Sequence, residues 1–214
     1  MGIVDLKNLG GISGKIGPYV AYVTKSGKQV LRKHIIPKDP KTPKQLAYRM
    51  RFGLVNKGLA PLNKVIKRGF PKTDNAYRSA VSKALGNAVV GEYPNYRLDY
   101  SKIQVAEGKL QLPDYVSADV DVVTGIAVFR WKPQLTSETS PGSVNDQVNI
   151  VYLNESIPEA VNLLNSAKRS AGTVAVDLNS KIKMQGELNL KEQHFWVYLS
   201  NFEEGEVSDS VYVC

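Results

Sequence analysis

The side chains that could do chemistry lie far apart in this sequence. The two histidines, His34 and His194, have no cysteine or second histidine nearby, and Cys214 is the one cysteine. A zinc site needs three or four converging ligands, and a catalytic histidine needs a partner group within hydrogen-bond reach. We therefore expect both histidines to be half-buried strand residues, and we expect no catalytic residue, no metal site and no cofactor.

Two acidic groups could also carry chemistry. Asp119 and Asp121 are two residues apart, so in a strand both carboxylates share one face, either as Ca²⁺ ligands or as a solvated surface. Three glutamates between residues 203 and 206 are typical of a solvated turn. The segment around Gly14 and Lys15 lacks the glycines of a phosphate-binding loop and of a nucleophile elbow. The sequence therefore indicates a protein that is not an enzyme.

Charge is distributed unevenly along the chain. Residues 1–91 hold 18 lysines and arginines against three aspartates, a net charge of +15. Residues 110–214 hold seven basic and 14 acidic residues, a net charge of −7, and the whole chain carries +8. This asymmetry indicates two modules with different partners, or two halves that attract each other within a chain or between chains.

The basic half contains the candidate polyanion-binding residues. Four cations surround a predicted hairpin turn, and three more share a helical face at the spacing i, i+3 and i+4. They are Lys25, Lys28, Arg32, Lys33, Lys64, Lys67 and Arg68. Tyrosines lie among them, and cations beside aromatic rings are what nonspecific nucleic-acid binding requires. The alternatives are docking on an acidic protein and a solvated, lysine-rich surface that prevents edge-to-edge strand pairing.

The first half of the sequence predicts a β-hairpin followed by helices. β-Branched and aromatic residues at 19–24 and 29–36 flank a short break that contains glycine, which is typical of a hairpin. Thr42 begins a helix with a capping-box pattern, and a short second helix follows. Thr73 or Asp74 caps a third helix, whose apolar residues repeat at helical spacing. That predicted apolar face consists of Tyr77, Ala80, Val81, Ala84, Leu85 and Ala88.

From about residue 97 onward the apolar period changes from 3.6 residues to two. Short strands between turn-rich spacers favour an antiparallel sandwich. The strands are predicted at 119–123, 126–131, 147–153, 173–178, 194–199 and 208–213. Residues 136–146 form a predicted polar loop, and residues 157–168 are either a short helix or an irregular crossover. The sequence thus predicts an α+β protein with a basic hairpin-plus-helices module, 1–96, and an antiparallel β-sandwich, 97–214.

The second half resembles a fibronectin type III domain. In that family a tryptophan on the second strand packs between the sheets, and Trp131 in the segment Ile126–Pro133 has the matching position. The aromatic segment Phe195–Leu199, a loop with Gly205 and a last strand follow the family's order. This likeness covers roughly residues 97–214, and it implies a fold rather than an activity.

The whole chain is similar to an uncharacterised family of small bacterial proteins, common in Bacteroidetes and catalogued only as a domain of unknown function. The residues that carry this resemblance are Gly14-Lys15-Ile16-Gly17, Val20, Gly27-Lys28, Arg32, Pro37, Thr42-Pro43-x-Gln45, and Arg49-x-x-Phe52 or Arg51-Phe52. The resemblance implies no known activity.

We expect a non-catalytic binding or assembly protein whose basic module docks on an acidic partner, either an unknown protein or another copy. The alternatives are a nucleic-acid-binding protein and a phage-derived or cell-surface structural component. The sequence has no signal-peptide pattern and no apolar run long enough for a membrane span, and its single cysteine fits a reducing compartment. We therefore expect a cytoplasmic location, with export by a phage or another signal-independent route left open.

Overall fold

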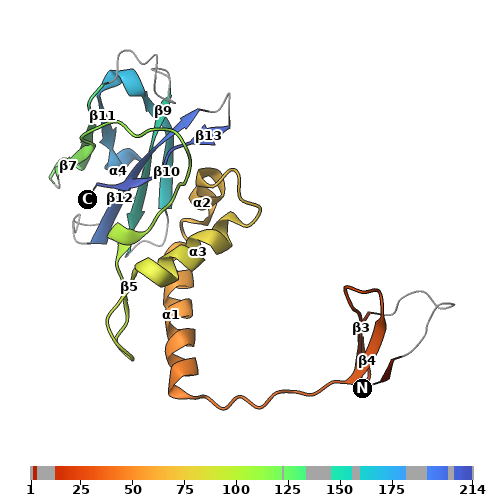
Figure 1. Cartoon of the computed structure of the whole chain (residues 1–214). Helices are drawn as coiled ribbons and strands as arrows, with labels where there is room; N and C mark the ends of the chain where they lie inside the picture. The colour runs from red at the N-terminus through yellow and green to blue at the C-terminus, as the bar shows by residue number, and fades with distance from the viewer. Residues whose placement is uncertain are drawn as a thin grey trace. The chain divides into compact units, whose positions relative to one another are not determined.

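A computed structural model describes residues 2–3, 13–121, 123–133, 146–155, 160–181, 192–201 and 205–213. The chain divides into two compact units, Met1–Thr42 and Pro43–Cys214. The smaller unit contains strands, and the larger unit contains helices and strands (Figure 1). The α+β class predicted from the sequence is confirmed. In the described part of the chain, no helix is both long enough and apolar enough to cross a bilayer.

The smaller unit, which we call the arm, is a four-stranded antiparallel sheet in the order β1-β4-β3-β2. Its strands are β1 (Gly2–Ile3), β2 (Gly14–Ile16), β3 (Tyr19–Val23) and β4 (Gln29–Lys33). The predicted hairpin is confirmed as β3–β4, and the Thr24 hydroxyl bonds to the Lys28 backbone across its turn. Gly27 has a φ of 76°, a left-handed conformation that glycine adopts without steric penalty.

The larger unit begins with three helices, α1 (Pro43–Leu59), α2 (Asn63–Gly69) and α3 (Ala76–Asn87). The predicted apolar face of α3 is confirmed, since its four small side chains are buried and Tyr77 and Leu85 are partly buried. The two predicted caps, Thr73 and Asp74, lie two residues and one residue before the observed cap. The N-cap is Asn75 because the Thr73 backbone N–H donates to the carbonyl of Phe70, which holds Thr73 in the preceding turn.

Three antiparallel sheets make up the rest of this unit. The five-stranded sheet has the order β10-β9-β12-β13, with β14 also paired to β12. Its strands are β9 (Gln147–Asn154), β10 (Ala160–Lys168), β12 (Gln193–Asn201), β13 (Glu206–Val207) and β14 (Val211–Tyr212). A three-stranded sheet, β11-β8-β7, comprises β7 (Ser117–Asp121), β8 (Ile126–Arg130) and β11 (Thr173–Asp177). The shortest pair is β5 (Val89–Val90) with β6 (Arg97–Leu98). Short helical turns follow at η1 (Tyr100–Lys102), η2 (Arg169–Ala171) and α4 (Leu178–Lys181).

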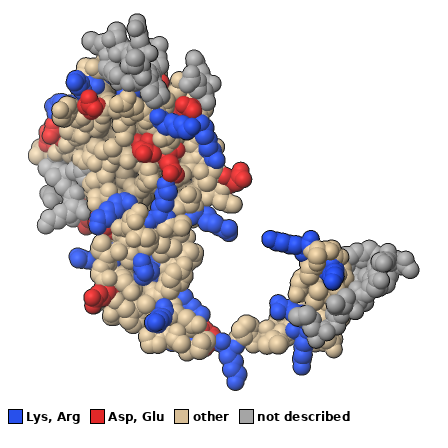
Figure 2. Space-filling model, viewed as in Figure 1, with Lys and Arg blue, Asp and Glu red and all other residues tan. Residues whose placement is uncertain are grey.

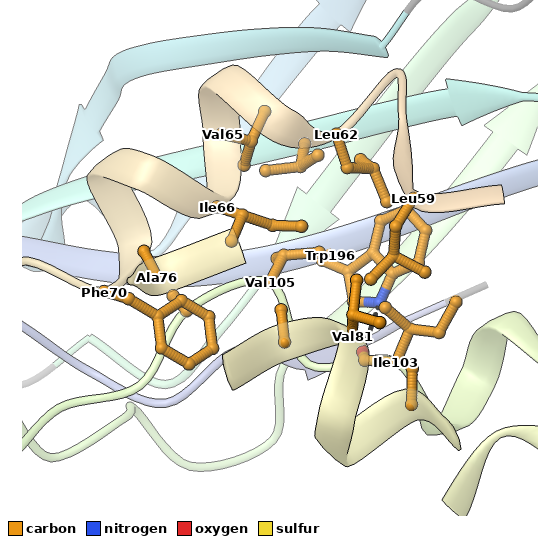
Figure 3. Close-up of a cluster of buried hydrophobic side chains, with 14 of the residues drawn as sticks. Leu59, Leu62, Val65, Ile66, Phe70, Ala76, Val81, Ile103, Val105 and Trp196 are labelled. Carbon is orange, nitrogen blue, oxygen red and sulfur yellow. Dashed lines mark hydrogen bonds between the residues drawn. The ribbon is translucent and has the colours of Figure 1, made fainter. Parts of the chain in front are cut away.

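The five-stranded sheet is buried on both faces. Along β12, Phe195 and Val197 pack into a core shared with the three-stranded sheet, whereas Trp196 and Tyr198 pack into a second core shared with the helices. Figure 3 shows the helix-side core, where Trp196 lies among side chains of α2, α3 and the segment after η1. This arrangement explains why β9 and β12 read as continuous apolar runs rather than alternating ones.

Residues on both sides of the predicted boundary at 96/97 share the helix-side core. Val55 and Leu62 lie before that boundary, and Val151 and Trp196 lie after it, yet all four belong to one cluster of buried side chains. The division between units in the structure falls after Thr42 instead. The helices therefore pack as a layer on the sheet.

Two predicted segments of the second half differ from the structure, and a third lies almost wholly outside the described residues. Residues 160–168 form strand β10 instead of a helix or an irregular crossover, since they pair with β9 along most of their length. Of the predicted last strand, 208–213, only Val211–Tyr212 is a strand, β14; the separate strand β13 precedes it, and the two pair with different parts of β12. Of the predicted polar loop, only Asp146 lies within the described residues.

Gly69, at the end of α2, lies against the backbone of the segment after η1. A Cβ atom there would lie 2.2 Å from the carbonyl oxygen of Val105, which belongs to the backbone and cannot rotate away. We expect Gly69→Ala to lower the free energy of unfolding by about 1–3 kcal/mol. Gly86→Ala is the matched control, because Gly86 has open space around it and alanine favours the helix by about 1 kcal/mol. Chemical denaturation measures both; equal effects would contradict this packing.

Candidate functional site

The four candidate cations of the arm surround its hairpin. Lys25 and Lys28 are exposed in the turn. Arg32 and Lys33 are neighbours in β4, so their side chains project from opposite faces of the sheet. The Arg32 guanidinium lies 5.9 Å from the centroid of the Tyr22 ring, within cation–π range. The arm therefore presents cations on both faces and at its tip.

The other three candidates lie in the larger unit. Lys64, Lys67 and Arg68 are exposed on α2, as their spacing predicts for one helical face. Within the described residues, none of the three forms an ion pair with an acidic side chain. The seven predicted residues thus belong to two units, four on the arm and three on α2.

The described part of the arm buries few of its apolar side chains. Within residues 13–42, Ala21 and Val30 are the buried hydrophobic residues. Large apolar side chains are exposed instead, namely Ile16, Tyr19, Tyr22, Val23, Ile35 and Ile36. Ile35 and Ile36, between β4 and α1, are 76% and 79% exposed. Such a density of exposed apolar groups is typical of surfaces that contact another macromolecule.

The first half of α1 is similarly uncovered. Leu46 and Met50 lie four residues apart in α1, and both side chains are exposed. The side chains of Tyr48 and Phe52 are exposed as well. The buried residues of α1 lie in its second half. Exposed apolar side chains are thus found at the start of the larger unit as well as in the arm.

Acidic side chains gather elsewhere. On the face shown in Figure 2, most of them lie over the sheets of the larger unit. Asp119 forms an ion pair with Arg130 on the neighbouring strand. Asp121 accepts hydrogen bonds from the Thr124 hydroxyl and from the backbone N–H groups of Val123 and Thr124, which lower the pKa of its carboxyl group. Both carboxylates are exposed; Asp119 links the two strands of the hairpin, and Asp121 holds its turn.

A polar cluster around His194 was not predicted from the sequence. In the tautomer protonated at Nε2, this ring donates to Glu155 at 2.9 Å, and its Nδ1 accepts from the Tyr212 hydroxyl at 3.0 Å. Tyr100 stacks on the ring, with centroids 4.2 Å apart. His194 is buried rather than half-buried as predicted. Both ring nitrogens are thus engaged in hydrogen bonds, and the ring holds Glu155 in place.

Glu155 faces a cleft of about 500 Å³ between α1, β6 and the end of β9. Lys57 and Arg97 contribute cations to its lining, and Leu98 contributes apolar surface. Gly58 allows α1 to lie close to Leu98 of β6, because a Cβ atom at Gly58 would lie 2.3 Å from Leu98 Cδ2. Among the described residues, no three His, Cys, Asp or Glu side chains group as metal ligands. The cleft can hold a small polar group, but its charges are mixed.

Glu155→Gln is expected to lower the pKa of Tyr100. Burial first and the negative charge of Glu155 second raise this pKa to about 12, since both disfavour the phenolate. Removing the carboxylate charge leaves burial alone, so the phenol ionises at a lower pH. Tyrosine ¹³Cζ chemical shifts followed by NMR during an alkaline titration measure the change. Burial also raises the pKa of Tyr198, so the Tyr198 resonance is the internal control. Equal movement of the two resonances would contradict the effect of Glu155 on the pKa of Tyr100.

No spacing rule could have found this cluster. His194 and Glu155 are 39 positions apart in the sequence, and Tyr100 lies in a different segment again. They meet because β9 pairs with β12 and η1 packs on the pair. The cluster follows from sheet register, which residue types alone do not specify.

A basic four-stranded arm and a larger unit in which helices cover a pair of sheets define an α+β protein. A family model described as "Family of unknown function (DUF6266)" matches residues 11–214, nearly the whole chain. The chain belongs to that family, and the predicted membership of a family of unknown function is confirmed. No curated protein and no solved structure matches it.

Proposed function

We propose that this chain is a non-catalytic binding and assembly protein whose arm docks on an acidic protein surface. The observation that carries the proposal is the composition of the arm's surface, where exposed apolar side chains lie beside exposed cations. Residues 1–42 hold eight lysines and arginines against two aspartates, a net charge of +6. Such a surface binds favourably to a partner surface on which carboxylates surround apolar groups.

Energetics also support a docked arm. Burying a valine contributes about 1.5–3 kcal/mol, whereas fixing the backbone of one residue costs about 1–2 kcal/mol. Two buried side chains, Ala21 and Val30, fall far short of ordering residues 13–42. Chains of roughly 40 residues usually need oligomerisation or another aid to stay folded. A partner surface would supply the missing apolar contact.

The absence of an enzymatic role is part of the proposal. Three of the groups that could do chemistry have structural partners among the described residues: His194 bonds through both nitrogens, and Asp119 and Asp121 bond within their hairpin. Strand order supports the fibronectin type III-like interpretation of the second half. The sheets β11-β8-β7 and β10-β9-β12-β13 face each other, and Trp131 is buried in the core between them.

The test compares the intact chain with a chain that lacks residues 1–42, using polyglutamate on a sensor surface as the acidic probe. At about 50 mM salt we expect the intact chain to bind and the shortened chain to bind at least tenfold more weakly. Equal binding by the two chains would contradict a docking role for the arm.

Nucleic-acid binding is the second candidate, and the exposed basic face of α2 favours it. Lys64, Lys67 and Arg68 share one side of a helix and have no acidic neighbour in ion-pair range among the described residues. On this account, Lys64→Glu, Lys67→Glu and Arg68→Glu together weaken binding to mixed DNA fragments and reduce the slope of its salt dependence by about three. Fluorescence anisotropy measures both. Unchanged DNA binding would remove α2 from this role.

A further inference from the structure

On one face of the arm, three residues on three neighbouring strands form a row in which basic and apolar side chains alternate. Lys15 on β2 lies opposite Val20 on β3, and Val20 lies opposite Arg32 on β4. Residues directly opposite each other in antiparallel strands project their side chains from the same face. Lys15 and Arg32 are exposed and Val20 is half-buried. We call these three residues the basic row, a cation on each side of an apolar side chain.

The outer face of the three-stranded sheet carries a row with the opposite charge. Asp121 on β7 and Asp177 on β11 both lie opposite Ile126 on β8. The neighbouring β8 residue, Ala127, points into the core, so Ile126 points outward and is 39% exposed. We call Asp121, Ile126 and Asp177 the acidic row. The next position outward on β8 is the half-buried Val128, which extends the apolar surface.

Local hydrogen bonds hold both carboxylates of the acidic row in place. Asp121 accepts from Thr124, and Asp177 accepts from the backbone N–H of Asn179 at 2.9 Å. The bonds from Thr124 also keep the pKa of Asp121 below its usual value, so it is ionised at neutral pH. Carboxylates that are already held in place lose little conformational entropy when a cation binds them.

The two rows match in spacing as well as in charge. Each spans three adjacent strands, and strands are about 4.8 Å apart, so the outer charges of each row have Cα atoms roughly 10 Å apart. A cation–apolar–cation row facing an acid–apolar–acid row forms two ion pairs around one apolar contact. Matching potentials of this kind fix the register of an interface.

We propose that the basic row of one copy of this chain docks on the acidic row of a second copy. This inference rests on the proposed function, and it names the acidic surface on which the arm docks. The two rows are different surfaces, so the contact is head-to-tail and builds a ring or a filament. A face of three short strands covers roughly 200–300 Å² per partner, below the about 800 Å² of a standard interface, so each contact is weak and sensitive to salt.

The experiment uses two charge-reversed chains, studied alone and mixed. One carries Lys15→Glu with Arg32→Glu, and the other carries Asp121→Lys with Asp177→Lys. In sedimentation velocity at low salt, we expect each variant alone to associate at least tenfold more weakly than wild type. An equimolar mixture is expected to recover association, because each variant offers the row that the other needs. A mixture that stays monomeric would overturn the contact between copies.

Two further variants keep the test independent of folding and of total charge. Asp121→Asn with Asp177→Asn keeps hydrogen-bond acceptors at both turns, removes the two charges, and is expected to weaken association with an unchanged melting temperature. Lys38→Glu with Lys41→Glu makes the same charge change as the arm variant, but off the row, and is expected to weaken association less than threefold. If this control weakens association as much as the row variant does, the basic row is overturned while general docking by the arm stands.

Discussion

Replacing Trp196 with alanine is expected to lower the free energy of unfolding by about 3–5 kcal/mol. Trp196 is fully buried where the helices meet the five-stranded sheet (Figure 3). Its Nε1–H donates to the carbonyl oxygen of Ile103 at 2.9 Å, and the indole packs edge-on against Tyr100 and Tyr212. Alanine would leave a cavity between the two layers and an unsatisfied buried carbonyl, and each is destabilising.

Denaturant unfolding monitored by circular dichroism measures this change. Trp196→Phe keeps most of the apolar contact but loses the N–H donor, so we expect an intermediate loss of about 1–3 kcal/mol. Tyr48→Ala is the matched control, because it removes an exposed aromatic ring from a helix and is expected to change stability by less than about 0.5 kcal/mol. If Trp196→Ala and Tyr48→Ala had equal effects, the shared helix–sheet core would be contradicted.

Removing residues 1–42 is expected to abolish association while leaving the melting temperature of the remaining chain within about 2 °C of the intact protein. Both described hydrophobic cores lie wholly within Pro43–Cys214, so their contacts are kept. The removed segment carries the net charge of +6 and the exposed apolar side chains of the arm.

Differential scanning calorimetry and sedimentation velocity on the same samples separate the two effects. A shortened chain that associates as the intact chain does would place the docking surface outside the arm. A large fall in melting temperature would instead show that the arm stabilises the larger unit.

Local signals in the sequence were sufficient to predict the helices and the hairpins. The spacing of Ala80, Val81 and Ala84 predicts one face of α3, and that face is buried. Alternation and turn residues likewise predict the pairs β3–β4 and β7–β8. These features depend on neighbours a few residues apart, and the sequence displays such neighbours directly.

The layer arrangement could not be read from the same signals. A strand buried on both faces loses its alternation, so the runs of β9 and β12 indicate burial without saying what covers each side. The prediction therefore divided the chain at 96/97, although Leu62 and Trp196 share one core. Residues 160–168 were ambiguous because β10 is an edge strand of intermediate burial with an irregular register between Leu163 and Ala167.

The candidate site was only partly predictable for a related reason. The clusters of basic residues are visible in the sequence, but Lys15 was not among the candidates and acquires its role only through pairing with Val20. Asp121 and Asp177 are joined in one row through Ile126, which requires two strand registers to be known. Charge composition shows which half is basic, whereas register shows which charges lie side by side.

The central claim is that the arm docks on the acidic surface of a second copy, and the salt dependence of self-association tests it most directly. Sedimentation velocity of the intact chain at about 50 mM and about 500 mM salt spans a change in Debye length from more than 10 Å to less than 5 Å. We predict assemblies larger than a monomer at low salt that dissociate to monomers at high salt. A chain that is monomeric at both concentrations, or assemblies that persist unchanged at high salt, would contradict electrostatic docking of the arm on a second copy.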